Sequence, residues 1–185
     1  MTATQSICHH IDGHALYECE AESLRGAVEQ AVRKGVSLKG ANLADANLRG
    51  ANLRGADLAD ANLARADLAG ANLTGVNLAD ANLADANLRG ANLADANLAD
   101  ANLAGANLGR AYLAGAYLAG ATLIDAGQES RGYRFVGVPT DGVRILAGCR
   151  WFTVTEAREH WSGNPEALAK AALIEAEAAR RGWIA

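Results

Sequence analysis

The sequence predicts a mainly β protein, a right-handed quadrilateral β-helix with small α/β capping segments at both ends. Three observations predict this fold. Leucine recurs at every fifth position from Leu38 to Leu123, eighteen times without a gap. Alanine stands two positions before the leucine in sixteen of the eighteen repeats, with Val36 and Val76 as the exceptions. Glycine, aspartate or arginine stands two positions after each leucine. Such self-similarity at a fixed period indicates a repeat architecture.

A period of five excludes the two ordinary secondary structures. On an α-helix, five residues advance the chain by roughly 500°, a net rotation of about 140°, so the leucines would point in all directions. On a strand, an odd period makes successive leucines alternate between the two faces. A chain that turns a corner after every five residues instead brings all leucines inside. Four such sides make a coil of twenty residues.

The residue types fit this coil. Leucine fills the interior, and the alanine before it fills an inner corner that has room only for a small side chain. Asparagine, aspartate and glycine tolerate the backbone of tight turns, and asparagine side chains bond to nearby backbone groups. The eighteen repeats make about four and a half coils, or roughly 22 Å of column at the spacing of paired strands. The leucines then stack in ladders, for example Leu38, Leu58, Leu78, Leu98 and Leu118.

Low-complexity disorder and a leucine-rich repeat horseshoe fit this segment less well. Disorder would suit the Ala, Gly, Asn and Asp content, but it does not account for eighteen leucines in one phase. Leucine-rich repeats have a period of about 20–29 residues rather than five. The division that follows is 1–35, 36–125 and 126–185: an N-terminal hairpin and capping helix, the repeat column, and a C-terminal α/β cap.

The flanking segments are suited to cover the ends of the column, whose open edges would otherwise pair with other chains. Residues 23–34 place their apolar side chains on one helical stripe. Ser23 is a capping residue for this helix and Gly35 ends it. Ahead of the helix, two short strand-like segments flank Asp12-Gly13, which predicts a tight hairpin.

The C-terminal sixty residues predict a compact α/β unit. Residues 133–138 and 143–154 are strand-like and surround a turn at 139–142. Thr153 and Glu156 have the spacing of a capping box that opens a short helix through Trp161. Asn164-Pro165 then begins a final helix that ends near Gly182.

Composition restricts the class of protein. The formal net charge of the chain is only −4, which favours neither nucleic acid nor an anionic membrane as a partner. Three irregularly spaced cysteines (Cys8, Cys19 and Cys149) do not form a disulfide framework. The N-terminus shows no secretory signal pattern, and no apolar run reaches the length of a membrane helix. A cytoplasmic protein with reduced thiols is the expectation.

The N-terminal hairpin holds the metal-type residues of the sequence. Cys8, His10 and Cys19 are the candidate ligands, with His9 and His14 beside them. Zinc needs ligands that converge tetrahedrally, and a hairpin that points His9 and His10 to opposite faces spreads them. Ordinary hairpin residues are the competing interpretation. Neither a phosphate loop nor a nucleophile elbow is present, so the sequence predicts no catalytic site and no cofactor.

The outward positions of the repeats carry charges and two aromatic residues. On a twenty-residue period Asp60, Asp80 and Asp100 stack on one side, which serves either solubility or a partner. Arg49, Arg89 and Arg110 gather on another. Tyr112 and Tyr117 replace asparagine on adjacent sides of the last full coil. They pack either on the C-terminal cap or on a partner, so these tyrosines and three aromatic residues of the cap are the interaction candidates: Tyr112, Tyr117, Trp151, Phe152 and Trp161.

The motif A-(N/D)-L-x-x, as in residues 41–45, resembles the pentapeptide repeat family over about half the chain. The resemblance implies a quadrilateral β-helix. We therefore expect a non-enzymatic interaction protein that binds an unidentified protein partner through its end caps, with a possible homodimer through the C-terminal cap. Some members of the family are DNA-mimic inhibitors of a type II topoisomerase, gyrase, through a strongly negative column. This alternative fits less well, because residues 36–125 hold nine Asp against six Lys and Arg.

Overall fold

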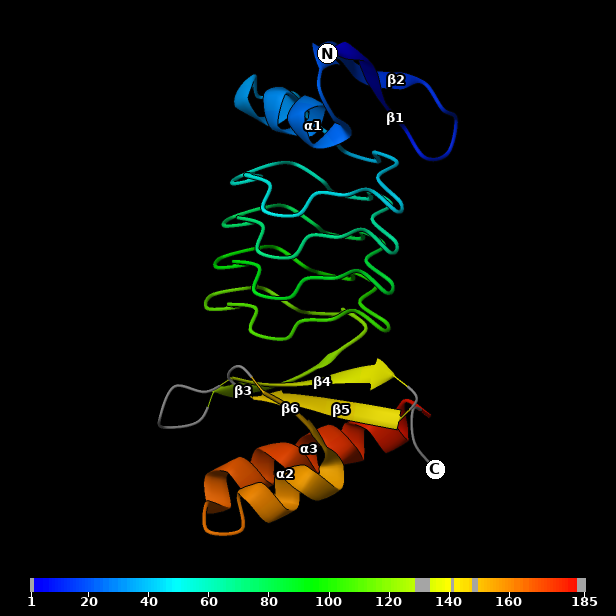
Figure 1. Cartoon of the computed structure of the whole chain (residues 1–185). Helices are drawn as coiled ribbons and strands as arrows, with labels where there is room; N and C mark the ends of the chain where they lie inside the picture. The colour runs from blue at the N-terminus through cyan, green and yellow to red at the C-terminus, as the bar shows by residue number, and fades with distance from the viewer. Residues whose placement is uncertain (1, 129–133, 141, 148–149, 183–185) are drawn as a thin grey trace. The chain divides into compact units, whose positions relative to one another are not determined.

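The structure is a computed structural model of the 185-residue chain, and it describes residues 2–128, 134–140, 142–147 and 150–182. The chain forms two compact units, Met1–Ala121 and Thr122–Ala185. The first unit holds a hairpin, a helix and the repeats, and the second holds a small sheet with two helices (Figure 1).

The repeats form stacked coils of twenty residues (Figure 1). Parallel bridges join residues twenty positions apart, from Asn42–Asn62 to Asn97–Tyr117. Between two coils, the Asn62 N–H donates to the Ala41 carbonyl at 2.8 Å, and the Leu43 N–H donates to the Asn62 carbonyl at 2.7 Å. Within the described column each side contributes a single bridged residue rather than an extended strand.

The leucines fill the inside of the coils, as the period predicts. Every repeat leucine from Leu38 to Leu123 is at most 7% exposed. The corner residues from Ala41 to Ala106, including Val76, are at most 5% exposed. Full burial of one leucine side chain contributes about 2 kcal/mol, so the stacked leucines are the main source of stability in this unit.

The turn after each leucine explains the third recurring position of the repeat. In the first turn, the Ala41 N–H donates to the Leu38 carbonyl at 3.0 Å, and Gly40 between them has a φ of 69°. A positive φ at this place is typical of a type II turn and favours glycine. Aspartate occupies the same conformation at six positions, and arginine occupies it at Arg65 and Arg110.

The N-terminal segment is a β-hairpin followed by a helix. Strands β1 (Ala3–Cys8) and β2 (Ala15–Ala21) pair antiparallel. Helix α1 (Leu24–Arg33) begins at the capping side chain of Ser23 and buries Ala27, Val28 and Ala31, which confirms the predicted helix and its apolar stripe.

The turn of this hairpin is wider than the two-residue turn that the sequence predicted. The His9 N–H donates to the His14 carbonyl, so four residues lie between the paired histidines. The Gly13 N–H donates to the His9 carbonyl at 3.0 Å, with a φ of 72° at Gly13. The Asp12 carboxylate accepts from the His14 N–H at 3.2 Å. These local bonds stabilise the wider turn.

The second unit is an antiparallel sheet with two helices. Its strands are β3 (Ile124–Gln128), β4 (Arg134–Thr140), β5 (Gly142–Ala147) and β6 (Arg150–Thr153), in the order β3-β4-β5-β6. Helix α2 (Val154–His160) begins at the predicted capping box of Thr153 and Glu156. Helix α3 (Pro165–Arg180) begins at Asn164. The core of the unit contains Ile145, Phe152, Ala157, Trp161 and Ile174.

Three features of this unit differ from the sequence-based expectation. Ile124 and Asp125, counted there with the last repeat, belong to strand β3. The strand-like run 143–154 is divided into β5, β6 and the first residue of α2. Thr140 pairs with Gly142, so strand pairing extends into the segment that was expected to be a turn.

Candidate functional site

The first coil is covered by the hairpin and by α1. The Asn42 N–H donates to the Cys8 carbonyl at 2.7 Å, and the His10 N–H donates to the Gly40 carbonyl at 2.8 Å. From the helix, the Glu29 carboxylate accepts from the Asn52 N–H at 2.9 Å. These bonds use polar backbone groups of the coil edge, which would otherwise be available to another chain.

A further contact joins the helix to the first coil, and another joins it to the hairpin. The Arg25 guanidinium donates to the Arg49 carbonyl at 3.0 Å. The Tyr17 hydroxyl donates to the Gln30 side chain at 2.6 Å. Hairpin, helix and first coil are therefore linked pairwise, and we call residues 2–34 the N-terminal cap.

Asparagines that precede the leucines make two kinds of bond along the outside of the column, as Asn77 shows. The Asn77 Oδ1 accepts from the Ala79 N–H at 3.3 Å, which holds its own turn. It also accepts from the Asn97 Nδ2 at 3.1 Å, one coil away. The Asn77 Nδ2 in turn donates to the Asp57 Oδ1 at 3.1 Å. The result is a ladder of side-chain amides that reinforces the stacking.

Asp57 begins this ladder as a carboxylate. The Ser37 hydroxyl donates to its Oδ2 at 2.6 Å. This bond, together with those from the Ala59 N–H and the Asn77 amide and the nearby charge of Lys39, holds the pKa of Asp57 below its usual range. The carboxylate is therefore ionised at neutral pH and accepts hydrogen bonds from both sides.

Charges on the outside of the column are partly paired. Arg65 forms a two-bond ion pair with Asp45, with both distances 2.7 Å, and this pair lowers the pKa of Asp45. Lys39 and Asp60 lie 3.2 Å apart. Arg49 lies 3.9 Å from Asp67. Exposed pairs of this kind contribute little to stability.

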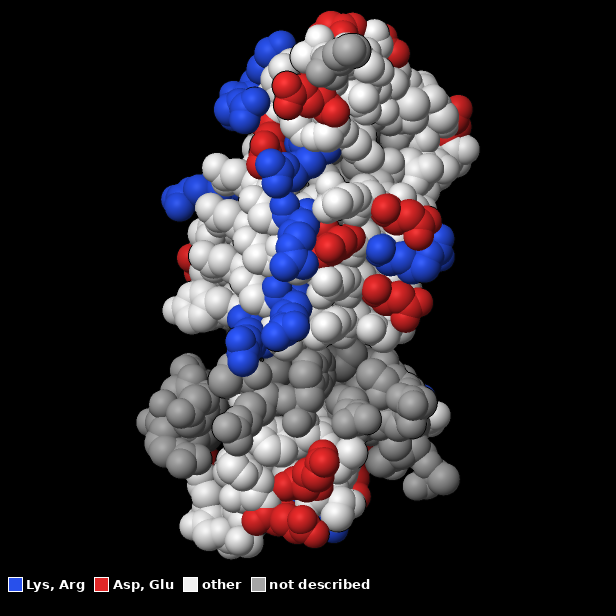
Figure 2. All heavy atoms as spheres, in the orientation of Figure 1, with Lys and Arg blue, Asp and Glu red and all other residues white. Residues whose placement is uncertain are grey.

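Other charges of the described column form no ion pair, namely Arg54, Asp80, Asp85, Arg89, Asp95, Asp100 and Arg110. Figure 2 shows a line of basic side chains along one face of the column, with acidic side chains beside it. The twenty-residue period places Arg49 and Arg89 on the same face, two coils apart. The surface is thus divided between both signs of charge.

The structure separates the metal-ligand candidates Cys8, His10 and Cys19. Cys19 pairs with Gln5, three residues along β1 from Cys8, which is about 10 Å on a strand. His10 lies in the turn, and its ring stacks on that of His9 at 5.3 Å between centroids.

A different set comes together at the same turn. The ligand atoms of His9, Asp12 and His14 all lie within 4.8 Å of one another. This set was not predicted from the sequence, because a two-residue turn was expected. The spacing of Asp12, three residues after one histidine and two before another, was the available signal.

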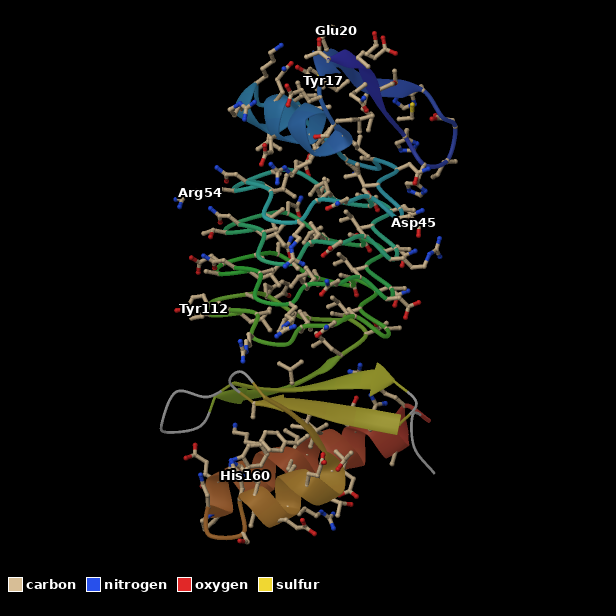
Figure 3. All side chains as sticks on the ribbon, viewed as in Figure 1. Tyr17, Glu20, Asp45, Arg54, Tyr112 and His160 are labelled. Atoms are coloured by element: carbon tan, nitrogen blue, oxygen red, sulfur yellow. The ribbon has the colours of Figure 1, made fainter. Side chains whose placement is uncertain are left out.

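The aromatic interaction candidates fall into two groups. Tyr112 and Tyr117 are each 60% exposed, and Figure 3 shows Tyr112 projecting outward from the column. Phe152 and Trp161 are 9% and 8% exposed, with ring centroids 4.6 Å apart in the core of the second unit, so they present little surface to a partner. The backbone of Trp151 lies in β6, but its side chain lies outside the described residues.

Two exposed apolar side chains were not singled out from the sequence. Ile11 at the hairpin turn is 79% exposed, and Leu173 on α3 is 53% exposed. Ile11 could have been noticed as an apolar residue within a polar turn. Leu173 gave no such signal, because its exposure depends on which face of α3 packs on the sheet.

Comparison with known proteins adds a family model and several solved structures. The model described as pentapeptide repeats matches residues 34–68, 61–98 and 96–126, in eight copies, which together span half the chain. No curated protein is significantly similar to the chain. Within the described residues, no helix has the length and apolar character to cross a membrane.

The similar structures are themselves pentapeptide repeat proteins. The protein alr5209 from Nostoc PCC 7120 is 40% identical, with 48% of this chain and 70% of that chain covered and a TM-score of 0.43. HetL from the same cyanobacterium, which is involved in heterocyst differentiation regulation, is 40% identical over 44% of this chain and 40% of its own, with a TM-score of 0.26. QnrB1, a plasmid-mediated fluoroquinolone resistance protein, is 24% identical over 43% of this chain and 39% of its own, with a TM-score of 0.40.

Proposed function

The chain belongs to the pentapeptide repeat family, and on that premise we propose that it is a non-enzymatic interaction protein that binds a protein partner through its ends. We take the column to be a right-handed quadrilateral β-helix of about four and a half coils, from its eighteen repeats. In this proposal the column is a rigid spacer, and the N-terminal cap, the last full coil and the C-terminal unit carry the specific contacts.

The distribution of exposed apolar side chains is the observation that carries the proposal. Among the described residues, the large apolar side chains with more than half of their surface exposed are Ile11, Tyr112, Tyr117 and Leu173. None of them lies between residues 36 and 111. Exposed aromatic and aliphatic groups are typical of protein interfaces, and here they occur in the N-terminal cap, the last full coil and the C-terminal unit.

The composition of the column supports a non-catalytic role. Its interior is filled by leucine and alanine side chains that are almost fully buried. Its asparagines are engaged in turns and amide ladders, as at Asn77. Both features leave the outward charges as the reactive groups of the column, and most of these charges lie at exposed positions.

Affinity capture from the native host tests the proposal. The full chain is immobilised beside the double variant Tyr112→Asn/Tyr117→Asn, which restores the residue that most repeats carry at this position and so preserves the turns. The matched control is Ala79→Lys/Ala99→Lys, which alters the outside of the middle coils. We expect the tyrosine variant to lose at least one captured protein that the control retains. Equal capture by all three proteins would argue against end binding.

A second copy of the chain is one possible partner, bound through the C-terminal unit. The exposed Leu173 on α3 supports this version of the proposal. Light scattering should then give the mass of a dimer for the natural chain and a lower mass for Leu173→Ser. If both proteins have the mass of a monomer, the chain does not bind a second copy of itself, and the partner is a different protein. The proposal also places the chain in the cytoplasm, which a fluorescent fusion in the host tests.

Inhibition of gyrase by DNA mimicry is the alternative function. A DNA mimic needs a surface of one sign, whereas both signs are present on this column (Figure 2). The twenty-residue period places Arg49 and Arg89 on the same side. A supercoiling assay with purified gyrase and topoisomerase IV distinguishes the two functions. The proposal predicts no inhibition at micromolar protein, and inhibition at that concentration would favour the mimic.

A further inference from the structure

The turn of the N-terminal hairpin brings two imidazoles and a carboxylate together. The Asp12 Oδ1 lies 3.2 Å from the His9 Nδ1 and 2.6 Å from the His14 Nδ1. We propose that His9, Asp12 and His14 form a binding site for a divalent transition-metal ion of the zinc class, and that the ion fastens the hairpin to the first coil. This site is independent of the partner binding proposed above.

The separations suit a small metal ion. Zinc binds imidazole nitrogen and carboxylate oxygen at about 2.0–2.2 Å in a tetrahedral arrangement, which puts two ligand atoms about 3.3 Å apart. The 3.2 Å between the His9 Nδ1 and the Asp12 Oδ1 already has this value. The 2.6 Å between the His14 Nδ1 and the same oxygen is a hydrogen bond. The ion takes the place of the proton on the His14 Nδ1, and the neutral His14 imidazole then carries its proton on Nε2.

The backbone holds the three ligands in place. The His9 N–H donates to the His14 carbonyl at 2.9 Å, which closes the turn between the two histidines. The His14 N–H donates to the Asp12 Oδ1, which orients the carboxylate. The rings of His9 and His14 are stacked, with centroids 5.1 Å apart and planes 16° apart. The nearly parallel rings must turn about their side-chain torsions before both nitrogens aim at one ion, while the backbone of the turn stays as it is.

The donor set selects the class of ion. Two imidazoles with one carboxylate suit Zn²⁺, Cu²⁺ and Ni²⁺, whereas Mg²⁺ and Ca²⁺ prefer oxygen ligands alone. The Asp12 carboxylate is exposed and supplies the anionic oxygen of the set. Three protein ligands leave the fourth position of the ion to water.

His9 also connects the turn to the column. It forms an antiparallel bridge with Ala41 of the first repeats. Its ring occupies the place where a Cβ of Gly40 would stand, because its Nε2 lies 2.2 Å from that position. An ion held by His9, Asp12 and His14 consequently restrains the turn against the first coil, and the N-terminal cap becomes harder to detach.

Calorimetric titration of the full chain with Zn²⁺ tests the site, with thermal unfolding as a second readout. We expect one ion per chain and a higher melting temperature in the presence of Zn²⁺, with no effect of Mg²⁺ at the same concentration. His14→Ala and Asp12→Asn should each weaken zinc binding by about 10-fold or more, since even groups that only orient a ligand have effects of this size. His160→Ala is the matched control and should bind as the natural chain does.

The variant Cys8→Ser/Cys19→Ser excludes the thiols as the source of binding. It should retain one zinc ion per chain, and NMR spectra should show shifts of the His9 and His14 ring signals on addition of Zn²⁺. Equal affinity in the natural chain and in His14→Ala overturns the proposal. Loss of zinc in the cysteine variant with retention in His14→Ala overturns it as well.

Discussion

At the scale of the residue, four of the five positions of the repeat have different physical roles. Leucine supplies the buried area, alanine leaves room at the corner, and asparagine bonds both to its own turn and to the next coil. The residue type two positions after leucine is restricted by backbone conformation, because φ is positive at this position in every repeat from Gly40 to Gly120. Each role is visible in the sequence as a restriction on residue type.

Arg110 is under backbone strain at this last position. Its φ is 62°, a conformation that costs a residue with a Cβ about 1 kcal/mol or more and costs glycine little. Arg110→Gly should therefore raise the free energy of unfolding by about 1 kcal/mol, measured by urea denaturation. Ala79→Gly changes a position without positive φ and should lower the free energy of unfolding instead. A loss of stability in Arg110→Gly would contradict the assignment of strain.

Asp57 makes the stability of the column depend on pH. Its pKa is lowered in the folded chain by the Ser37 hydroxyl. The stabilising contribution of this carboxylate is thus present above its unfolded pKa of about 3.9 and is lost as the pH falls through the lower folded value. Asp57→Asn does not titrate, so its urea midpoint should fall less between pH 7 and pH 3 than that of the natural chain. Asp80→Asn is the control, and an identical pH response in Asp57→Asn would refute this role.

Leu78 and Ala79 test which side of the chain faces inward. Leu78 is 0% exposed, and a charge at that place has no partner among leucines and alanines. Leu78→Asp should abolish folding, because the cost of several kcal/mol is a large part of typical domain stability. Ala79→Lys places its charge outside and should leave the circular dichroism spectrum unchanged. The reverse pattern would mean that inward and outward positions are exchanged.

At the scale of the element, the N-terminal cap depends on bonds from side chains to the coil edge. The Asn52 N–H has the Glu29 carboxylate as its acceptor. Glu29→Ala should remove about 1 kcal/mol of stability and speed hydrogen exchange at the Asn52 amide. Glu29→Gln keeps an acceptor and should retain most of the protection. If exchange at Asn52 is the same in all three proteins, the helix does not cap that edge.

Elements with a strong local pattern could be predicted from the sequence, and elements set by tertiary pairing could not. Helix α1 has a capping serine and an apolar stripe, and α2 has a capping box, so both were predicted nearly to the residue. Strand β3 covers IDAGQ, which has neither β-branched enrichment nor alternation, and it pairs with β4 through an irregularity between Asp125 and Gly127. The segment is a strand because it pairs with β4, and the sequence of the segment alone does not indicate this.

The turn at His9 to His14 shows the same limit for the candidate site. The hairpin itself was predictable from Asp12-Gly13, but the length of the turn depends on the bonds of His9 with His14 and of His10 with Gly40. Those bonds decide which side chains converge. The exposed tyrosines were predictable as departures from asparagine, whereas the burial of Phe152 and Trp161 follows from the packing of α2 and α3 on the sheet.

At the scale of the whole molecule, the repeats should be interchangeable in units of one coil. Deletion of residues 57–76 joins Ala56 to Asn77 and keeps every remaining position on its side. In a repeat column each coil contacts only its neighbours, so the shortened chain should fold with a moderate loss of stability and a cooperative urea transition. Deletion of residues 57–58 breaks the phase of the leucines and should unfold the column. Folding of both deletions, or of neither, would contradict a twenty-residue coil.

Specific binding lies at the ends of the chain in the proposed function, and the column only separates them. The sharpest test of this division is quantitative affinity capture from the native host with two folded variants, the deletion of residues 57–76 and Tyr112→Asn/Tyr117→Asn. We expect the deletion variant to capture the same proteins as the natural chain and the tyrosine variant to lose at least one of them. Loss of capture by the deletion variant, with full capture by the tyrosine variant, would place the binding surface on the column instead.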